Sequence, residues 1–269
     1  MIDLARKIKL SDEIVCKVKV FYDKHKEDIE LCADKCLADS FGILGKKDPL
    51  FRLAVILVLA VKVKKKYDKA GIAEEIYYDT MSDIKIWADK CDAEGLENYS
   101  WLKNHVSFEL FKIGRLQFQF YECTGRTVLY KKLPFDYGEK VIYIHIPEGE
   151  KLEKEKCIAS LKKANKFFAE FFPNYLYRYY FCESWLLFEG NREFMSADSN
   201  IVNFMSVFDI CYSVKIDKQA IERIFGKRRF LKKSYPEKTT LQKQAKKYML
   251  NGKRLGVGVG VIEKERYNK

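Results

Sequence analysis

The chain has 269 residues, of which 48% are hydrophobic and 14% aromatic, and its formal net charge is +12. This length allows two domains with cores of their own, and the composition excludes a disordered or collagen-like chain. The eight cysteines include no C-x-x-C pair, which favours a reduced cytoplasmic protein over a disulfide-rich secreted one. Cys32 and Cys36 share a helix face, but only His25 nearby is a further ligand type, so we expect no metal site.

Membrane insertion is not expected from this sequence. The N-terminus MIDLARKIKLSDE has no apolar core of the kind that a signal peptide requires. The most apolar run, residues 50–61, is twelve residues long and contains Arg52, so it is too short to cross a bilayer. We therefore expect a buried helix there and no membrane partner.

The positive charge is concentrated in short runs at residues 62–66, 227–233 and 243–247. A solvated lysine-rich surface is the favoured interpretation of any single run. The alternative is attraction of a polyanion, which includes nucleic acid, an acidic membrane surface and a cofactor with several phosphates. These runs lack the aromatic interleaving of known RNA-binding modules, so nucleic acid is not the expected partner.

Residues 1–106 are predicted to form an all-helical N-terminal domain. Ser11 precedes two acidic residues and an apolar stripe of helical period, which is typical of a helix start. Asp48 and Pro49 begin a second helix in the same way, and Gly71 ends it. Two shorter amphipathic segments, 73–78 and 82–90, follow.

From residue 107 to 269 the pattern predicts a second domain of mixed α/β type. Apolar and polar residues alternate at 114–122, which indicates a half-buried strand, and the segment 140–146 is apolar on both faces like a central strand. The predicted strands are 114–122, 126–132, 140–146, 175–188, 211–216 and 255–263. The predicted helices begin near residue 153 and span about 199–207, 218–225 and 240–251. The helix after residue 153 makes the strand 175–188 parallel to 140–146.

The segment KRLGVGVG at 253–260 contains the glycines of a phosphate loop but lacks its context. Such a loop needs a helix N-terminus directly after it, and only an extended tail follows here. The glycines are better explained by a strand that another part of the chain approaches closely.

A buried strand, a Pro/Gly turn and an amphipathic helix follow one another between Val141 and Pro173. The free N–H groups and partial positive charge of a helix start favour a phosphate or a carbonyl oxygen at such a turn. His145 ends the strand, on the face opposite to Ile144 and Ile146. An imidazole at the carboxyl end of a central strand is suited to act as a general base, and a packed structural histidine is the equally weighted alternative.

Glu183 is the second candidate base. Strand alternation places it on one face with Phe181, Trp185 and Leu187, where burial would raise its pKa. An ion pair with Arg115 or Arg178 is an equally good explanation. Cys182 is a weak candidate for a nucleophile, because a buried cysteine is usually a small hydrophobic residue.

The segments GRLQFQF (114–120), YIHIPEGEKL (143–152), CESWLLF (182–188) and ADSNIVNF (197–204), with TTLQKQAKKYM (239–249), resemble bacterial acyltransferase-domain proteins. In that family a helical N-acyltransferase N-terminal domain precedes a GNAT-like C-terminal domain. The matching motifs cover about residues 108–262, and the N-terminal half resembles the family only in being helical. It implies an all-helical domain followed by a GNAT-like mixed sheet flanked by helices.

The resemblance also implies roles for residues. Backbone groups near Ile144 and Ile146 would hold the pantetheine arm of acetyl-CoA or another acyl-CoA. Amides of Gly149, Glu150 and Lys151 would face the pyrophosphate. The acceptor, a small-molecule or peptide amine, would attack the thioester near His145 and Glu183. The candidates for contacting this acceptor are Arg115, Gln117, Trp185 and Asn200.

Two functions follow from these observations. The leading hypothesis is N-acyl transfer from acyl-CoA to an amine by direct attack. The alternative is a non-catalytic binding or regulatory protein on a degenerate GNAT scaffold, whose basic surface engages a protein or nucleic acid.

Overall fold

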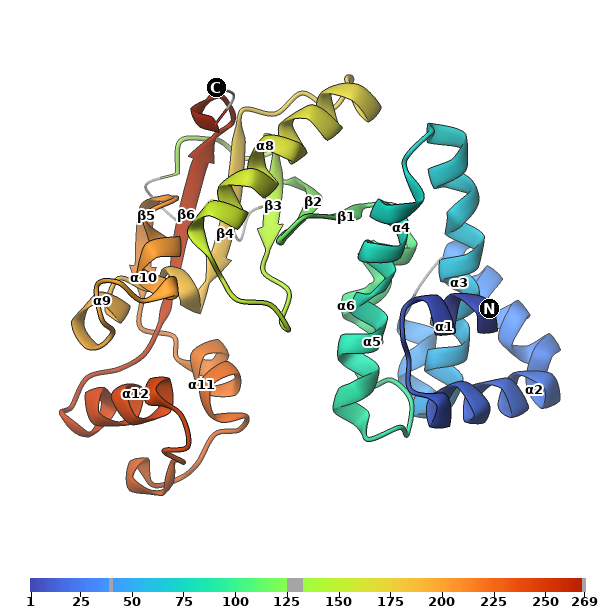
Figure 1. The fold of residues 1–269 in the computed structure, drawn as a ribbon, viewed down its shortest axis with the longest axis horizontal. Coiled ribbons are helices and arrows are strands. Elements are labelled where there is room, and N and C mark those ends of the chain that lie inside the picture. The colour runs from blue at the N-terminus through green and yellow to red at the C-terminus, as the bar shows by residue number, and fades with distance from the viewer. Residues whose placement is uncertain (39–40, 125–132, 268–269) are drawn as a thin grey trace. The chain divides into compact units, whose positions relative to one another are not determined.

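A computed structural model describes residues 1–38, 41–124 and 133–267 (Figure 1). The chain divides into two compact units. One comprises Met1–Gln119 with Ile146–Gly149, and the other comprises Phe120–His145 with Glu150–Lys269. We call them the N-terminal and the C-terminal unit.

The N-terminal unit is helical up to residue 106, as predicted. Asp48 accepts a hydrogen bond from the Phe51 N–H at 2.9 Å, Pro49 is the first helical residue, and Gly71 ends the helix at φ +72°. These are the signals on which the prediction of this helix depended. None of the described helices is both long and apolar enough to cross a membrane. The helical segments are α1 (Ile2–Lys7), α2 (Asp12–Ala38), η1 (Phe41–Lys46), α3 (Pro49–Ala70), α4 (Glu74–Met81), α5 (Asp83–Ala88), η2 (Asp89–Cys91) and α6 (Tyr99–Val106).

The described strands form one six-stranded mixed sheet in the order β1-β2-β3-β4-β6-β5. The pairs β1–β2, β4–β6 and β5–β6 are antiparallel, whereas β3 and β4 are parallel as predicted. A helical region followed by a mixed sheet is the predicted fold class. The strands are β1 (Leu110–Ile113), β2 (Leu116–Glu122), β3 (Lys140–His145), β4 (Tyr179–Ser184), β5 (Asp209–Val214) and β6 (Val257–Glu263).

Two strand predictions need correction and one is outside the described residues. The strand β1 was not predicted, because the alternating pattern of 114–122 begins after it. The predicted strand 175–188 is reduced to β4, since the Ser184 hydroxyl accepts a hydrogen bond from the Leu186 N–H at 3.2 Å and starts a 3-10 turn, η3 (Trp185–Leu187). The predicted strand 126–132 falls within residues 125–132, which the structure does not describe.

The helices of the C-terminal unit correspond closely to the predicted ones. The predicted segment 218–225 is α11, and the others agree within a few residues at each end. Three of the short helical segments given below, α9, η4 and η5, were not predicted. The helices are α8 (Lys154–Phe171), α9 (Asn191–Phe194), α10 (Asn200–Met205), α11 (Lys218–Phe225), η4 (Lys232–Ser234), α12 (Thr240–Leu250) and η5 (Lys264–Tyr267).

Helix α8 covers one face of the sheet in the C-terminal unit (Figure 1). The ring of Phe168 packs edge-on against Phe120 of β2, at 5.5 Å between centroids. The Tyr180 hydroxyl on β4 donates a hydrogen bond of 2.6 Å to Asn165 Oδ1. Because side chains alternate along a strand, Tyr180 and Cys182 are on the α8 face, and Phe181 and Glu183 are on the opposite face.

Gly256, just before β6, and Gly258 within it are both approached closely by other parts of the main chain. A Cβ added at Gly258 would lie 1.9 Å from the Leu187 carbonyl oxygen, and one at Gly256 would lie 2.2 Å from that of Val214. Contacts this short with main-chain atoms leave no room for a side chain. This confirms the interpretation of the segment as a strand.

Replacing Gly258 with alanine is expected to lower the free energy of unfolding by on the order of 3 kcal/mol, because β4 or η3 must move to admit the methyl group. Urea denaturation followed by circular dichroism measures this loss. Gly260→Ala is the comparison, since its Cβ would meet the Phe208 side chain at 2.9 Å and no main-chain atom is among the nearest contacts. Equal effects of the two substitutions would contradict the backbone explanation.

Candidate active site

The carboxyl ends of β3 and β4 form the centre of the candidate site in the C-terminal unit. The register between these strands comprises Ile142 with Tyr180 and Tyr143 with Phe181, whereas β4 stays in register with β6 as far as Ser184. Among the described residues, β3 and β4 are therefore paired only at Ile142 and Tyr143, and not at the last two residues of β3. In open α/β sheets ligands bind outside the carboxyl ends of such strands.

His145 is half-buried at the last position of β3. Its ring stacks on that of Tyr143, with 4.4 Å between centroids and 14° between planes. The Tyr143 hydroxyl in turn donates a hydrogen bond of 3.3 Å to the main-chain carbonyl of Glu183 on β4. Tyr143 thus connects the two predicted catalytic positions, and sequence reasoning had not identified it.

The Tyr143 hydroxyl stays protonated at neutral pH. Burial raises its pKa well above the usual value, and the nearby Cys182 and Glu183 act in the same direction. A protonated hydroxyl is a permanent donor to the Glu183 carbonyl, so the stacked pair of rings is held in place relative to β4. The sequence signal that could have identified Tyr143 is its position two residues before His145 on the same strand face.

Aromatic and aliphatic side chains surround this cluster on the sheet face opposite α8. The Phe181 ring is perpendicular to Tyr143 at 5.0 Å, and Tyr121 packs edge-on against Tyr143 at 5.4 Å. The buried residues of this cluster are Cys123, Phe135, Val141, Phe181, Val259 and Val261. A half-buried imidazole at the end of such a face is placed in apolar surroundings that strengthen its hydrogen bonds.

Glu183 is half-buried, which is less than the burial expected from the sequence. By strand alternation and the β3–β4 register, its side chain is on the same sheet face as Tyr143 and His145. Of its two suggested ion-pair partners, Arg178 lies 3.8 Å from the Glu263 carboxylate and Arg115 donates to a main-chain carbonyl.

Cys182 faces α8 and is fully buried, and burial raises the pKa of its thiol far above the usual value. A thiol that stays protonated is a poor nucleophile. Cys182 is therefore better explained as a small buried hydrophobic residue than as a nucleophile.

The turn after β3 belongs to the N-terminal unit and is held by side chains of that unit. Arg115 is buried and its Nη1 donates a hydrogen bond of 3.0 Å to the Pro147 carbonyl. The Lys90 ammonium contacts the Glu148 carboxylate at 2.9 Å. Gly149 has φ +96°, where L-residues are strained, and a Cβ there would meet open space. Arg115, expected to contact the acceptor, thus has a defined structural partner.

The remaining positions for the cofactor differ in exposure. Ile144 is fully buried and Ile146 is half-buried, whereas Glu150 and Lys151 are exposed where the chain approaches α8. Glu153 precedes the helix, and its carboxylate contacts the Lys156 ammonium at 3.0 Å. Because Glu148 and Glu153 are both paired with lysines, their charges are partly compensated.

The other predicted acceptor contacts, Gln117, Trp185 and Asn200, belong to different units and have different surroundings. Gln117 is buried in the N-terminal unit, where its amide donates a hydrogen bond of 3.1 Å to Asp83 Oδ1. Trp185 is half-buried, and its main-chain N–H donates to Gln219 Oε1 at 2.6 Å. Asn200 is exposed at the start of α10, where Ser199 caps the helix by accepting from the Val202 N–H at 3.3 Å. Within the C-terminal unit, His145 and Glu183 are on one face of the sheet, whereas Gln117 belongs to the N-terminal unit.

Comparison with known protein families gives the same organisation. Residues 1–108 match the N-acyltransferase N-terminal domain family, and residues 110–262 match the GNAT-like C-terminal domain family. The chain belongs to the GNAT-like N-acyltransferases. The predicted family and enzyme class of this acyltransferase are thus confirmed.

Solved structures with the same fold are acyltransferases too. An acyltransferase in complex with decanoyl-CoA and teicoplanin is 19% identical, with a TM-score of 0.78 over 97% of this chain and 86% of that one. An acyltransferase mutant bound to octanoyl-CoA is 18% identical, with the same TM-score and coverage. A complex with decanoyl-CoA is 23% identical, with a TM-score of 0.68 over 79% of this chain and 65% of that one. No curated protein sequence matches the acyltransferase.

Proposed function

We propose that this acyltransferase moves a medium-chain acyl group from acyl-CoA to the amine of a small molecule or peptide, with His145 as general base. The observation that carries the proposal is the stack of His145 on Tyr143 beside Glu183, at the end of the short β3–β4 ladder. The complexes of similar folds with octanoyl-CoA and decanoyl-CoA support the donor, and the one with teicoplanin supports an amine-bearing acceptor of some size.

The chemistry needs one base and one acid. The amine nitrogen attacks the thioester carbonyl carbon, the C–N bond forms, and the C–S bond breaks. His145 accepts the proton that the amine loses, and the imidazolium so formed is the acid that returns it, directly or through water, to the departing CoA thiolate. Glu183 is the second proton-accepting group on the same strand face. Direct attack requires no acyl-enzyme, which agrees with the buried, protonated thiol of Cys182.

Main-chain groups around the end of β3 are the proposed contacts of the donor. Ile144 and Ile146 would hold the pantetheine arm through backbone hydrogen bonds. The amides of Gly149, Glu150 and Lys151 would face the pyrophosphate, and the start of α8 favours negative charge. Trp185 and Asn200 remain the proposed acceptor contacts in the C-terminal unit. The other two candidates, Arg115 and Gln117, are bonded within the N-terminal unit, to the Pro147 carbonyl and to Asp83.

A thermal-shift series with acetyl-, octanoyl- and decanoyl-CoA tests the donor. A ligand at about 100 times its Kd stabilises the folded state by about 2.7 kcal/mol, which raises the melting temperature by several degrees. We expect the largest shift with octanoyl- or decanoyl-CoA. Thiol release with a panel of amines then tests transfer. Absence of any shift at millimolar acyl-CoA would contradict the proposal and favour the non-catalytic alternative.

A further inference from the structure

Almost all the net charge of the acyltransferase comes from one segment. Residues 215–254 contain 14 Lys and Arg against 3 Asp and Glu, an excess of 11 in a chain whose total is +12. The other parts of the chain are therefore nearly neutral in sum. A field concentrated in this way attracts a polyanion to one small part of the surface. We call residues 215–254 the basic segment.

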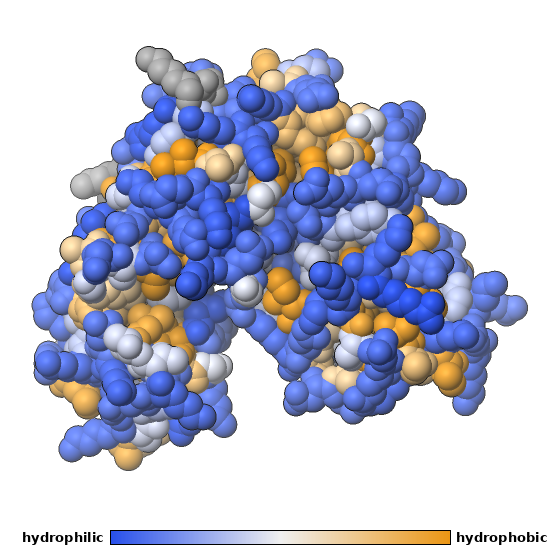
Figure 2. Space-filling model, viewed as in Figure 1, coloured by the Kyte–Doolittle hydropathy of each residue, from blue (hydrophilic) through white to orange (hydrophobic). Residues whose placement is uncertain are grey.

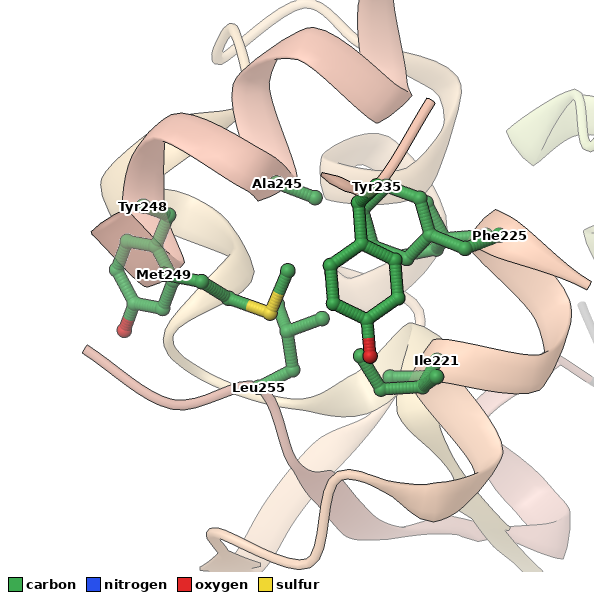
Figure 3. Close-up of a cluster of buried hydrophobic side chains, with 9 residues drawn as sticks. Ile221, Phe225, Tyr235, Ala245, Tyr248, Met249 and Leu255 are labelled. Carbon is green, nitrogen blue, oxygen red and sulfur yellow. The ribbon is translucent and has the colours of Figure 1, made fainter. Parts of the chain in front are cut away.

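The basic segment follows β5 and precedes β6 in the sequence, and its helices pack around a cluster of buried hydrophobic side chains. Buried residues of α11 and α12 pack around Tyr235 and Leu255 (Figure 3). Tyr235 packs on Phe225 at 4.5 Å, and its hydroxyl accepts a hydrogen bond of 3.1 Å from the Arg229 N–H. The Lys232 ammonium donates a hydrogen bond of 2.9 Å to the Met249 carbonyl. These contacts fix the loop between α11 and α12 on both sides of its tip.

The tip of this loop presents two apolar side chains to solvent. Phe230 is 100% exposed and Leu231 is 62% exposed. Lys227, Arg228 and Arg229 precede them, two lysines follow, and the sequence has no acidic residue between 223 and 236. In Figure 2, orange atoms lie among blue ones over the part of the surface that carries α11 and α12. An exposed apolar pair within a basic run has the pattern of an interfacial membrane contact.

We propose that this tip docks on the surface of an anionic lipid bilayer. Phe230 and Leu231 enter the headgroup region and remove apolar area from water, while the Lys227, Arg229 and Lys233 side chains meet anionic lipid headgroups. Of the other two cations of this run, Arg228 forms an ion pair with Asp217 at 2.5 Å and Lys232 donates to the Met249 carbonyl. Charge alone would suit a nucleic acid or an acidic protein equally. The exposed Leu231 beside Phe230 favours a lipid surface over nucleic acid, because an aliphatic side chain cannot stack on bases.

This contact is peripheral and needs no spanning helix, so it departs from the expectation that the chain has no membrane partner. It does not depend on the proposed acyl transfer. It would place the enzyme at a surface into which long acyl chains partition.

Vesicle co-sedimentation tests the proposal with the full chain. We expect binding to phosphatidylcholine vesicles that contain about one third phosphatidylglycerol, weakened by salt, and none to pure phosphatidylcholine. The double variant Phe230→Ser/Leu231→Ser should bind at least about tenfold more weakly. Leu176→Ser is the matched control, because Leu176 is 79% exposed in the same unit but outside the basic segment.

Further variants separate charge from insertion. Arg229→Glu/Lys233→Glu should abolish vesicle binding, whereas Lys163→Glu/Lys166→Glu on α8 changes the net charge equally and should retain it. In Phe230→Trp, the indole emission should shift to the blue on adding anionic vesicles. No vesicle binding at low salt, or binding unchanged in Phe230→Ser/Leu231→Ser, would overturn the proposal. So would tighter binding to RNA than to vesicles. Melting curves of each variant check that it is folded.

Discussion

Replacing His145 with alanine is expected to lower kcat by a factor of at least about one hundred, because the attacking amine then loses its proton acceptor. Binding of acyl-CoA should change little, since the proposed donor contacts are main-chain groups. Steady-state thiol release gives kcat and KM, and the thermal shift gives donor binding separately. A loss in kcat with a retained thermal shift is the result that identifies a base rather than a donor contact.

A matched control exists within the chain. His25 is also half-buried, and its ring packs on Phe21 at 4.6 Å. His25→Ala removes an imidazole of similar exposure from α2 and should leave kcat unchanged. A His145→Ala enzyme with the wild-type kcat would show that the imidazole only packs against Tyr143.

Glu183→Gln distinguishes a catalytic role of the Glu183 carboxylate, as a proton acceptor, from a purely structural one. If the carboxylate accepts the proton, directly or through water, kcat should again fall by about one hundredfold or more. The substitution keeps the main-chain carbonyl that accepts from Tyr143, so the His145–Tyr143 stack should persist. Glu189→Gln, at an exposed position five residues after β4 ends, is the control. Unchanged rates in both His145 and Glu183 variants would remove the catalytic assignment.

The local signals of this sequence predict its helices well and its strand ends poorly. Asp48, Pro49 and Gly71 specify α3 through capping and backbone conformation, which depend on neighbouring residues alone. The end of β4 depends instead on the Ser184 hydroxyl bond to the Leu186 N–H. The segment around it is apolar and aromatic in both conformations, so composition cannot separate a strand from a 3-10 turn.

The alternation of side chains along a strand was enough to predict part of the site. Alternation places His145 and Glu183 on one face once β3 and β4 are parallel neighbours. The Tyr143 bond to the Glu183 carbonyl joins positions 40 residues apart, and no periodicity contains that information. Gln117 shows the same limit: its place on a strand was predicted, but its burial depends on Asp83, 34 residues earlier.

Asp83 is the centre of a buried polar network in the N-terminal unit, and its loss is expected to be severely destabilising. The carboxylate is 3% exposed and accepts hydrogen bonds from Trp101 Nε1 at 2.6 Å and Trp87 Nε1 at 3.2 Å. His105 Nε2, also fully buried, lies 3.2 Å from it. Asp83→Ala removes this acceptor from the buried His105 and from the half-buried indole N–H groups, so the free energy of unfolding should fall by about 3 kcal/mol or more. Urea denaturation measures it. Asp89→Ala, at the exposed ion pair with Lys85 and six residues further along the chain, should cost less than about 1 kcal/mol.

The same network predicts a specific acid sensitivity. Burial by itself would raise the pKa of Asp83, but the hydrogen bond and charge of His105, with hydrogen bonds from Trp101 and Gln117, lower it to about 2. A carboxyl whose pKa is lower in the folded state contributes stability above its unfolded pKa, near 4, and loses it as the pH falls towards 2. The contribution is about 2 kcal/mol. Unfolding free energies of the wild type and Asp83→Asn should therefore converge as the pH falls from 5 to 3. A difference between the wild type and Asp83→Asn that is constant across this range would show that the network holds Asp83 without lowering its pKa.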